Sequence, residues 1–142
     1  MLCCAWTIQA QHLSFHNISS NSQLPSGETR KLCQDSDGYL WIPTSNGLAR
    51  YDGYDFLFVK TDKSTRQQVL SGYVNLVSED SSGNLWIGTN NGLFLMDKET
   101  GNISKKLTPV MDNSHIEAVL PAKDGTVWVA TNRGLFAKLP NS

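Results

Sequence analysis

The amino-acid sequence predicts an all-β fold: a β-propeller of three four-stranded antiparallel blades that form an incomplete ring. One pattern of twenty residues occurs three times along the chain without gaps, and its tryptophans are Trp41, Trp86 and Trp128. Their spacings of 45 and 42 residues match the length of one propeller blade, which is about 40–45 residues. No segment of the chain has the pattern of a convincing amphipathic helix.

Each repeat divides into short apolar strands separated by glycine turns. One glycine lies three residues before each tryptophan, and a second lies six residues after it. In the second repeat these are Gly83, after Asp-Ser-Ser, and Gly92, after Asn-Asn, which are typical turn sequences. The expected strands include first strands over 74–78 and 116–120, second strands over 40–43, 85–88 and 127–130, third strands from Leu48, Leu93 and Leu135, and weaker fourth strands over 54–59 and 103–107.

The recurring tryptophans are expected to be scaffold. Each lies in the middle of a strand between apolar neighbours, where an indole can pack between adjacent blades and bury on the order of 150–250 Å². Identical positions in a repeat usually have the same structural role, so we expect Trp41, Trp86 and Trp128 all to be buried.

The chain is expected to begin with a leader. Residues 1–10 are similar to the end of a signal peptide, with a cleavage site after Ala10, but they lack the basic n-region and a full apolar segment. We therefore interpret 1–10 as a truncated signal peptide, the alternative being an ordinary first strand. Residues 11–142 form the partial propeller, with repeats around 28–60, 73–108 and 115–142.

Composition argues against several classes of protein. The 12 basic and 13 acidic residues form no basic patch, so nucleic acid is not an expected partner. No run of about 18 apolar residues is present to span a membrane. Cys3 and Cys4 lie at the beginning of the chain, and Cys33 is expected to be a small buried apolar residue rather than a nucleophile.

The sequence around the first two tryptophans resembles the two-component regulator propeller repeat. The matching strings run from Gln34 to Leu48, followed by Arg50-Tyr51-Asp52-Gly53, and from Glu79 to Leu93. This resemblance implies the periplasmic sensor of a hybrid two-component histidine kinase, as in Bacteroides-type bacteria. It also implies a ligand derived from complex carbohydrates and a full-length receptor that is a homodimer. The kinase module is absent from this chain, so the chain itself is not expected to be an enzyme.

No catalytic, metal-binding or cofactor-binding residues can be assigned, and the ligand-binding residues stay unknown. His115, in Asn113-Ser114-His115-Ile116-Glu117, is superficially similar to the phosphoacceptor box of histidine kinases, but the repeat places it at the start of a strand. Asp35-Ser36-Asp37-Gly38 is similar to the beginning of a calcium loop, yet position 12 of that loop would be Asn46 instead of glutamate. We interpret the segment as a polar turn.

Three repeats are fewer than a closed ring needs. A propeller usually has 4–8 blades, and a three-blade arc would expose apolar faces at both ends. We therefore expect a fragment of a longer sensor, whose gene continues beyond Ser142 with more repeats, a membrane span and a kinase module. Two alternatives stay open: a self-assembling propeller lectin or interaction module, and a fragment of a streptogramin-lyase-like enzyme, for which the chain offers only His12, His16 and His115.

Overall fold

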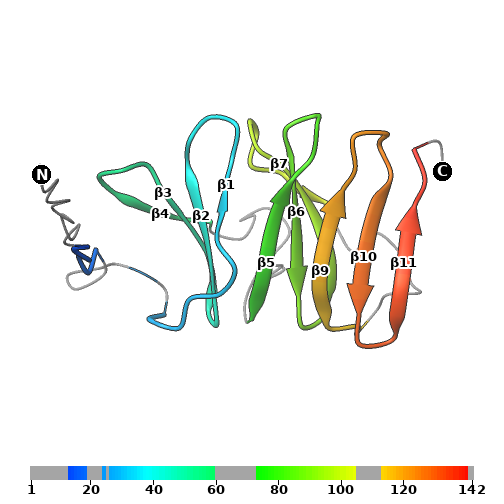
Figure 1. Cartoon of the computed structure of the whole chain (residues 1–142), viewed down its shortest axis with the longest axis horizontal. Coiled ribbons are helices and arrows are strands. Elements are labelled where there is room, and N and C mark those ends of the chain that lie inside the picture. The colour runs from blue at the N-terminus through cyan, green and yellow to red at the C-terminus, as the bar shows by residue number, and fades with distance from the viewer. Residues whose placement is uncertain (1–12, 19–23, 25, 60–72, 105–112, 141–142) are drawn as a thin grey trace, which may run out of the picture.

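The chain folds into three antiparallel sheets that stand side by side, as the computed structural model shows for residues 13–18, 24, 26–59, 73–104 and 113–140 (Figure 1). The strands of each sheet follow one another in chain order. The first blade contains β1 (Cys33–Gln34), β2 (Leu40–Thr44), β3 (Gly47–Tyr51) and β4 (Phe56–Phe58). The second contains β5 (Val74–Glu79), β6 (Asn84–Thr89), β7 (Gly92–Asp97) and β8 (Ile103–Ser104), and the third contains β9 (Ile116–Pro121), β10 (Val127–Thr131) and β11 (Gly134–Lys138).

These strands confirm the architecture predicted from the repeats. The central strands β2, β6 and β10 cover the three predicted segments, with the tryptophan at an equivalent position in each. The third blade has three strands within the described residues. The fourth strand of the second blade was predicted over 103–107; residues 105–107 lie outside the described residues, as does the predicted leader over 1–10. No helix in the described part of the chain is long and apolar enough to cross a membrane.

The hairpin after each central strand is closed by a threonine and a glycine. In the second blade the Thr89 hydroxyl donates to the Gly92 carbonyl oxygen at 2.8 Å and accepts from the Asn91 N–H at 3.0 Å. Gly92 has a φ of 125°, which side chains strongly disfavour. The same bonds occur at Thr44 and Thr131, so the Thr-x-x-Gly spacing of the repeat encodes this turn.

Two apolar clusters hold the blades together. The first lies between the first and second blades and contains Trp41, Leu48, Val74, Val77, Leu85, Ile87, Phe94 and Met96, with Cys33 packed against it. The second lies between the second and third blades and contains Leu76, Trp86, Leu93, Ile116, Val119, Val127 and Val129. The first and second blades therefore each contribute their tryptophan to the cluster that they share with the following blade.

The prediction that all three tryptophans are buried is wrong for Trp128. Trp86 is 4% exposed, whereas Trp128 is 43% exposed. The leucine that follows the hairpin glycine shows the same change, from 2% at Leu93 to 67% at Leu135. Trp128 and Leu135 lie on the face of the third blade that points away from the second blade. Within the described residues no further sheet covers this face, so both side chains are exposed. The open face is apolar and also exposes Leu120.

Close contact between the second and third blades depends on one glycine. A Cβ atom added to Gly88 would lie 2.8 Å from Cγ2 of Ile116 and 3.0 Å from Cγ of Leu76. Any side chain at this position would therefore collide with β9 and with its own sheet. Gly88 lets Ile116, which is fully buried, pack directly on the backbone of β6.

Candidate functional site

The turn between the first and second strands of a blade has the same backbone in all three repeats. In the first blade the Asp35 carbonyl oxygen accepts from the Gly38 N–H at 3.0 Å, and the Asp35 N–H donates to the Tyr39 carbonyl oxygen at 3.0 Å. The corresponding bonds at Asp80 are 3.0 and 2.9 Å, and those at Ala122 are 3.0 and 2.7 Å. Differences between these three turns must therefore arise from their side chains.

An aspartate in this turn holds the tryptophan of its own blade. The Asp80 carboxylate accepts from the Ser82 N–H at 2.9 Å, the Asn84 N–H at 3.0 Å and Nε1 of Trp86 at 2.9 Å. Asp35 makes the same three bonds in the first blade, with Nε1 of Trp41 at 2.8 Å. The third blade has Ala122 at this position. Sequence analysis missed this role, although an aspartate six residues before the tryptophan in two repeats was its signal.

The predicted polar turn at Asp35 is thus a turn, and it also touches the next blade. The Ser36 N–H donates to Oε2 of Glu79 at 2.6 Å, and the Ser36 hydroxyl donates to Oε1 at 2.8 Å. Nζ of Lys98, at the end of β7, lies 2.6 Å from Oε1 of Glu79 and 2.7 Å from Oδ2 of Asp37. We call Ser36, Asp37, Glu79 and Lys98 the inter-blade latch, because they join the turn of the first blade to the second.

The latch charges stabilise one another away from bulk water. The side chains of Glu79 and Lys98 are both mostly buried, and Oδ2 of Asp35 lies 3.9 Å from Nζ of Lys98. Burial raises the pKa of Glu79, but the hydrogen bonds from Lys98 and Ser36 outweigh it, so its net pKa lies below the ordinary value. The hydrogen bonds to Asp37 and Glu79 raise the pKa of Lys98 well above its ordinary value. Both groups are therefore charged at neutral pH.

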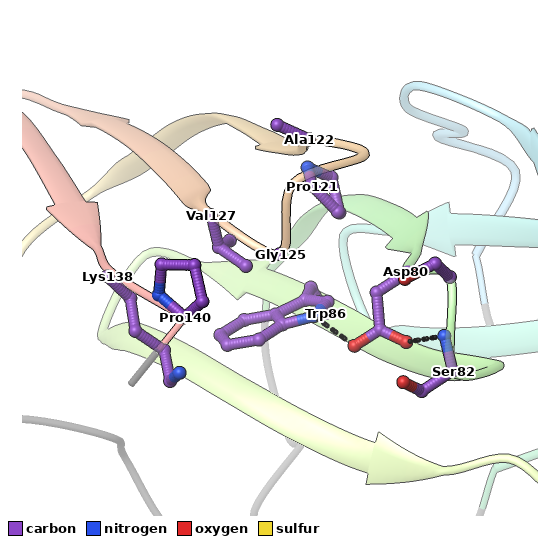
Figure 2. Close-up of a pocket in the computed structure, with 10 residues that line it drawn as sticks. Asp80, Ser82, Trp86, Pro121, Ala122, Gly125, Val127, Lys138 and Pro140 are labelled. Atoms are coloured by element: carbon purple, nitrogen blue, oxygen red, sulfur yellow. Dashed lines mark hydrogen bonds between the residues drawn. The ribbon is translucent and has the colours of Figure 1, made fainter. Parts of the chain in front are cut away.

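A pocket occupies the equivalent place between the second and third blades. It has a volume of about 240 Å³ and is lined by Asp80, Ser81, Ser82, Trp86, Pro121, Ala122, Gly125, Val127, Lys138 and Pro140. Figure 2 shows Pro121 and Pro140 on the third-blade side, facing the Asp80 turn and the indole of Trp86. We call this the blade 2–3 pocket.

The repeat alignment explains why a pocket replaces the latch. Pro121 of the third blade stands where Glu79 stands in the second, and Pro140 stands where Lys98 stands. Neither proline can make an ion pair, so the ion pair of Glu79 with Lys98 has no counterpart at these two positions. The turn has the same backbone conformation at both junctions. At the first junction the side chains of Glu79 and Lys98 fill the space between the blades, and at the second this space is left as the pocket.

The structure places His115 where the repeat predicted it. It directly precedes β9, and its carbonyl oxygen accepts from the Asn132 N–H at 3.1 Å. The carbonyl oxygens of Tyr73 and Glu28 accept equivalent bonds in the other blades, at 3.3 and 3.2 Å. His115 thus lies at the beginning of a strand, where its backbone binds the hairpin between β10 and β11. It does not lie on the helix that a phosphoacceptor histidine needs.

Cys33 is half-buried at the edge of the first apolar cluster. Burial raises the pKa of its thiol, and the thiol lies 3.7 Å from the Gln34 carbonyl oxygen. A raised pKa lowers the thiolate fraction at neutral pH, which is the form that attacks electrophiles. This environment agrees with the predicted packing role.

The family model described as "Two component regulator propeller" matches residues 23–46 and 68–91. Two segments of the chain thus match the two-component regulator propeller repeat. The two matched segments hold the first two Asp-turn-Trp units of the fold. The third repeat lies outside the match, and it departs from the pattern with Pro121-Ala122 in place of Glu79-Asp80.

Solved structures with a similar fold come from B. thetaiotaomicron. One is the extracellular domain of BT4673, described as a hybrid two component system, with a TM-score of 0.69 and 24% identity over 84% of this chain and 16% of that one. Another is the extracellular domain of BT3049, also described as a hybrid two component system, with a TM-score of 0.60 and 22% identity over 78% of this chain and 14% of that one. The chain thus spans about one sixth of these structures, and at this identity the likeness establishes the fold. No curated protein is significantly similar to the chain.

Proposed function

We propose that this chain is part of the extracytoplasmic ligand-sensing propeller of a two-component receptor, of the hybrid histidine kinase type. The observation that carries the proposal is the regulator propeller repeat, matched twice and folded as consecutive blades. The repeat description is that of a regulator, and the structural neighbours are extracellular domains of proteins described as two component systems. A periplasmic location, a carbohydrate-derived ligand and a homodimeric full-length receptor complete the proposal.

The open face of the third blade supports a longer propeller. Trp128 and Leu135 expose on this face the side chains that the other two blades bury, and Leu120 is exposed beside them. Such a patch is costly in water and invites association. We infer that a fourth blade of the same protein packs on this face in the full-length receptor. Self-assembly of separate chains would cover the same face, which is the lectin-like alternative.

Signalling by the natural gene tests the sensor role. In the organism that carries the gene, residues 26–140 are deleted in frame, and transcription of neighbouring carbohydrate-utilisation genes is measured after addition of oligosaccharide mixtures. The proposal predicts that at least one mixture induces transcription in the wild type, and that the deletion abolishes this induction. Induction that survives the deletion would contradict it. Lys123→Gln, at an exposed position of the third-blade turn, is the matched control and should respond as the wild type does.

A further inference from the structure

The blade 2–3 pocket retains the carboxylate-binding half of the inter-blade latch. In the latch, the N–H and hydroxyl of Ser36 both donate to the Glu79 carboxylate, at 2.6 and 2.8 Å. Ser81 stands at the equivalent position of the second blade, in a turn with the same backbone hydrogen bonds. Neither donor of Ser81 has a partner among the described residues, and Ser81 lines the pocket.

The charges around the pocket favour an anion at Ser81. The Asp80 carboxylate is already engaged by the N–H groups of Ser82, Asn84 and Trp86, which disperse its charge. Lys138 lines the pocket and brings an ammonium group, whose only described partner is the uncharged Leu139 carbonyl oxygen at 3.3 Å. The second blade thus has the same two donors as the latch, on the exposed Ser81, with Pro121 in place of the carboxylate. Figure 2 shows Lys138 beside Pro140, at the other end of the Trp86 indole from the Asp80 turn.

The size and walls of the pocket limit what can enter. Its volume of about 240 Å³ is below the range of about 300–1,000 Å³ that is usual for drug-sized ligands, so it suits a small molecule. Pro121, Pro140 and the edge of the Trp86 indole provide apolar walls beside the polar turn (Figure 2). A ligand with one carboxylate and a compact apolar or mixed body fits this combination.

We propose that the blade 2–3 pocket binds a small carboxylate-bearing ligand. The carboxylate accepts from the N–H and hydroxyl of Ser81, as Glu79 accepts from Ser36, and the charge of Lys138 on the pocket wall favours an anion. The ligand thereby supplies the inter-blade contact that the sequence supplies between the first two blades. This inference concerns binding alone and goes beyond the proposed signalling role.

Acetate is the probe that tests the shared chemistry. The isotope-labelled 142-residue chain is titrated with sodium acetate at constant ionic strength, and backbone amide shifts are followed by NMR. We expect a saturable shift of the Ser81 amide and none of the Ser36 amide, which Glu79 already engages. Acetamide, a neutral molecule of the same shape, should not shift Ser81 at the same concentrations. An unchanged Ser81 amide, or an equal response to acetamide, overturns the proposal.

Two variants and a control separate the site from general charge effects. Lys138→Gln should raise the acetate Kd by about two- to threefold, as expected for loss of a positive charge on the pocket wall without a direct contact. Pro121→Glu should abolish acetate binding, because an internal carboxylate would occupy Ser81. Lys123→Gln removes an exposed charge outside the pocket lining and should leave the Kd unchanged. Equal weakening by both lysine variants would overturn the proposal, and Lys138→Gln decides the matter if Pro121→Glu does not fold.

Acetate binding and receptor signalling can fail separately. Binding of acetate together with unaltered transcription in the deletion strain would leave the pocket assignment standing and contradict the proposed function. Loss of induction in the deletion strain without acetate binding would do the reverse.

Discussion

Nε1 of Trp86 donates a hydrogen bond of 2.9 Å to the carboxylate of Asp80, six residues earlier in the same blade. The bond fixes the indole against the third blade and at the same time holds the turn that borders the blade 2–3 pocket. One aspartate therefore couples the apolar core to the polar rim. This coupling is repeated at Asp35 and Trp41.

Replacing this aspartate should cost stability through unpaired donors. Asp80→Ala removes the acceptor of three N–H groups, including the nearly buried indole, and should destabilise the chain by about 2–3 kcal/mol. The free energy of unfolding is measured by urea denaturation. The matched control is Asp124→Ala in the third turn, where the exposed carboxylate accepts the N–H of Thr126 and no indole N–H, so the loss should be smaller, about 1 kcal/mol. Equal losses for both variants would refute a special role for Asp80.

The tryptophans should differ in their contributions. Trp86→Ala is expected to cost about 3–5 kcal/mol, because a fully packed aromatic side chain is lost. Trp128→Ala should cost clearly less in this chain, since Trp128 is about half exposed. Urea denaturation of both variants provides the comparison. If Trp86→Ala leaves the urea denaturation midpoint unchanged, the indole is not part of the structural core. A ligand-stacking role would then need consideration.

The latch should give stability a defined pH dependence. The pKa of Glu79 is lowered from 4.5 in the folded state, so its contribution is present above about pH 4.5 and is lost as the pH falls below this value. The pKa of Lys98 is raised from 10.5, so its contribution is present below about pH 10.5 and is lost at higher pH. Asp35 and Asp37 also face Lys98.

Glu79→Gln tests the acid limb of this dependence. The variant should lose about 1–2 kcal/mol at pH 7, and its stability should fall less than that of the wild type between pH 5 and 3. Denaturation midpoints measured across that range give the comparison. Parallel curves for the two proteins would show that the latch does not contribute to acid sensitivity.

Gly88 should not tolerate a side chain. Gly88→Ala places a methyl group 2.8 Å from Ile116, and overpacking of this kind costs about 1–3 kcal/mol. The chain itself has alanine at the equivalent position of the third blade, Ala130, where no described sheet packs on that face. Ala130→Gly therefore serves as the control and should change the denaturation midpoint little. If Gly88→Ala were neutral, the two sheets would have to separate more easily than their packing indicates.

The repeat made most of the fold predictable, because the glycine turns and the alternating apolar residues are local signals. The exposure of Trp128 was not predictable from its own repeat, since burial depends on a neighbouring sheet and not on the strand itself. The latch was hidden for a related reason: Ser36 and Glu79 are far apart in sequence, and they meet only once the blades are stacked. The blade 2–3 pocket exists because Pro121 and Pro140 have no charged side chains to form the ion pair that Glu79 and Lys98 form. This difference is visible only when the two blade junctions are compared in the structure.

The reading frame beyond codon 142 tests the central claim most directly. We expect the natural gene to continue after Ser142 with further propeller repeats, followed by a membrane-spanning segment and a histidine kinase module. Sequencing the flanking DNA gives the answer without any assumption about the ligand. An in-frame stop codon immediately after Ser142, together with a closed homo-oligomer of this chain in solution, would contradict the receptor account and favour a self-assembling propeller.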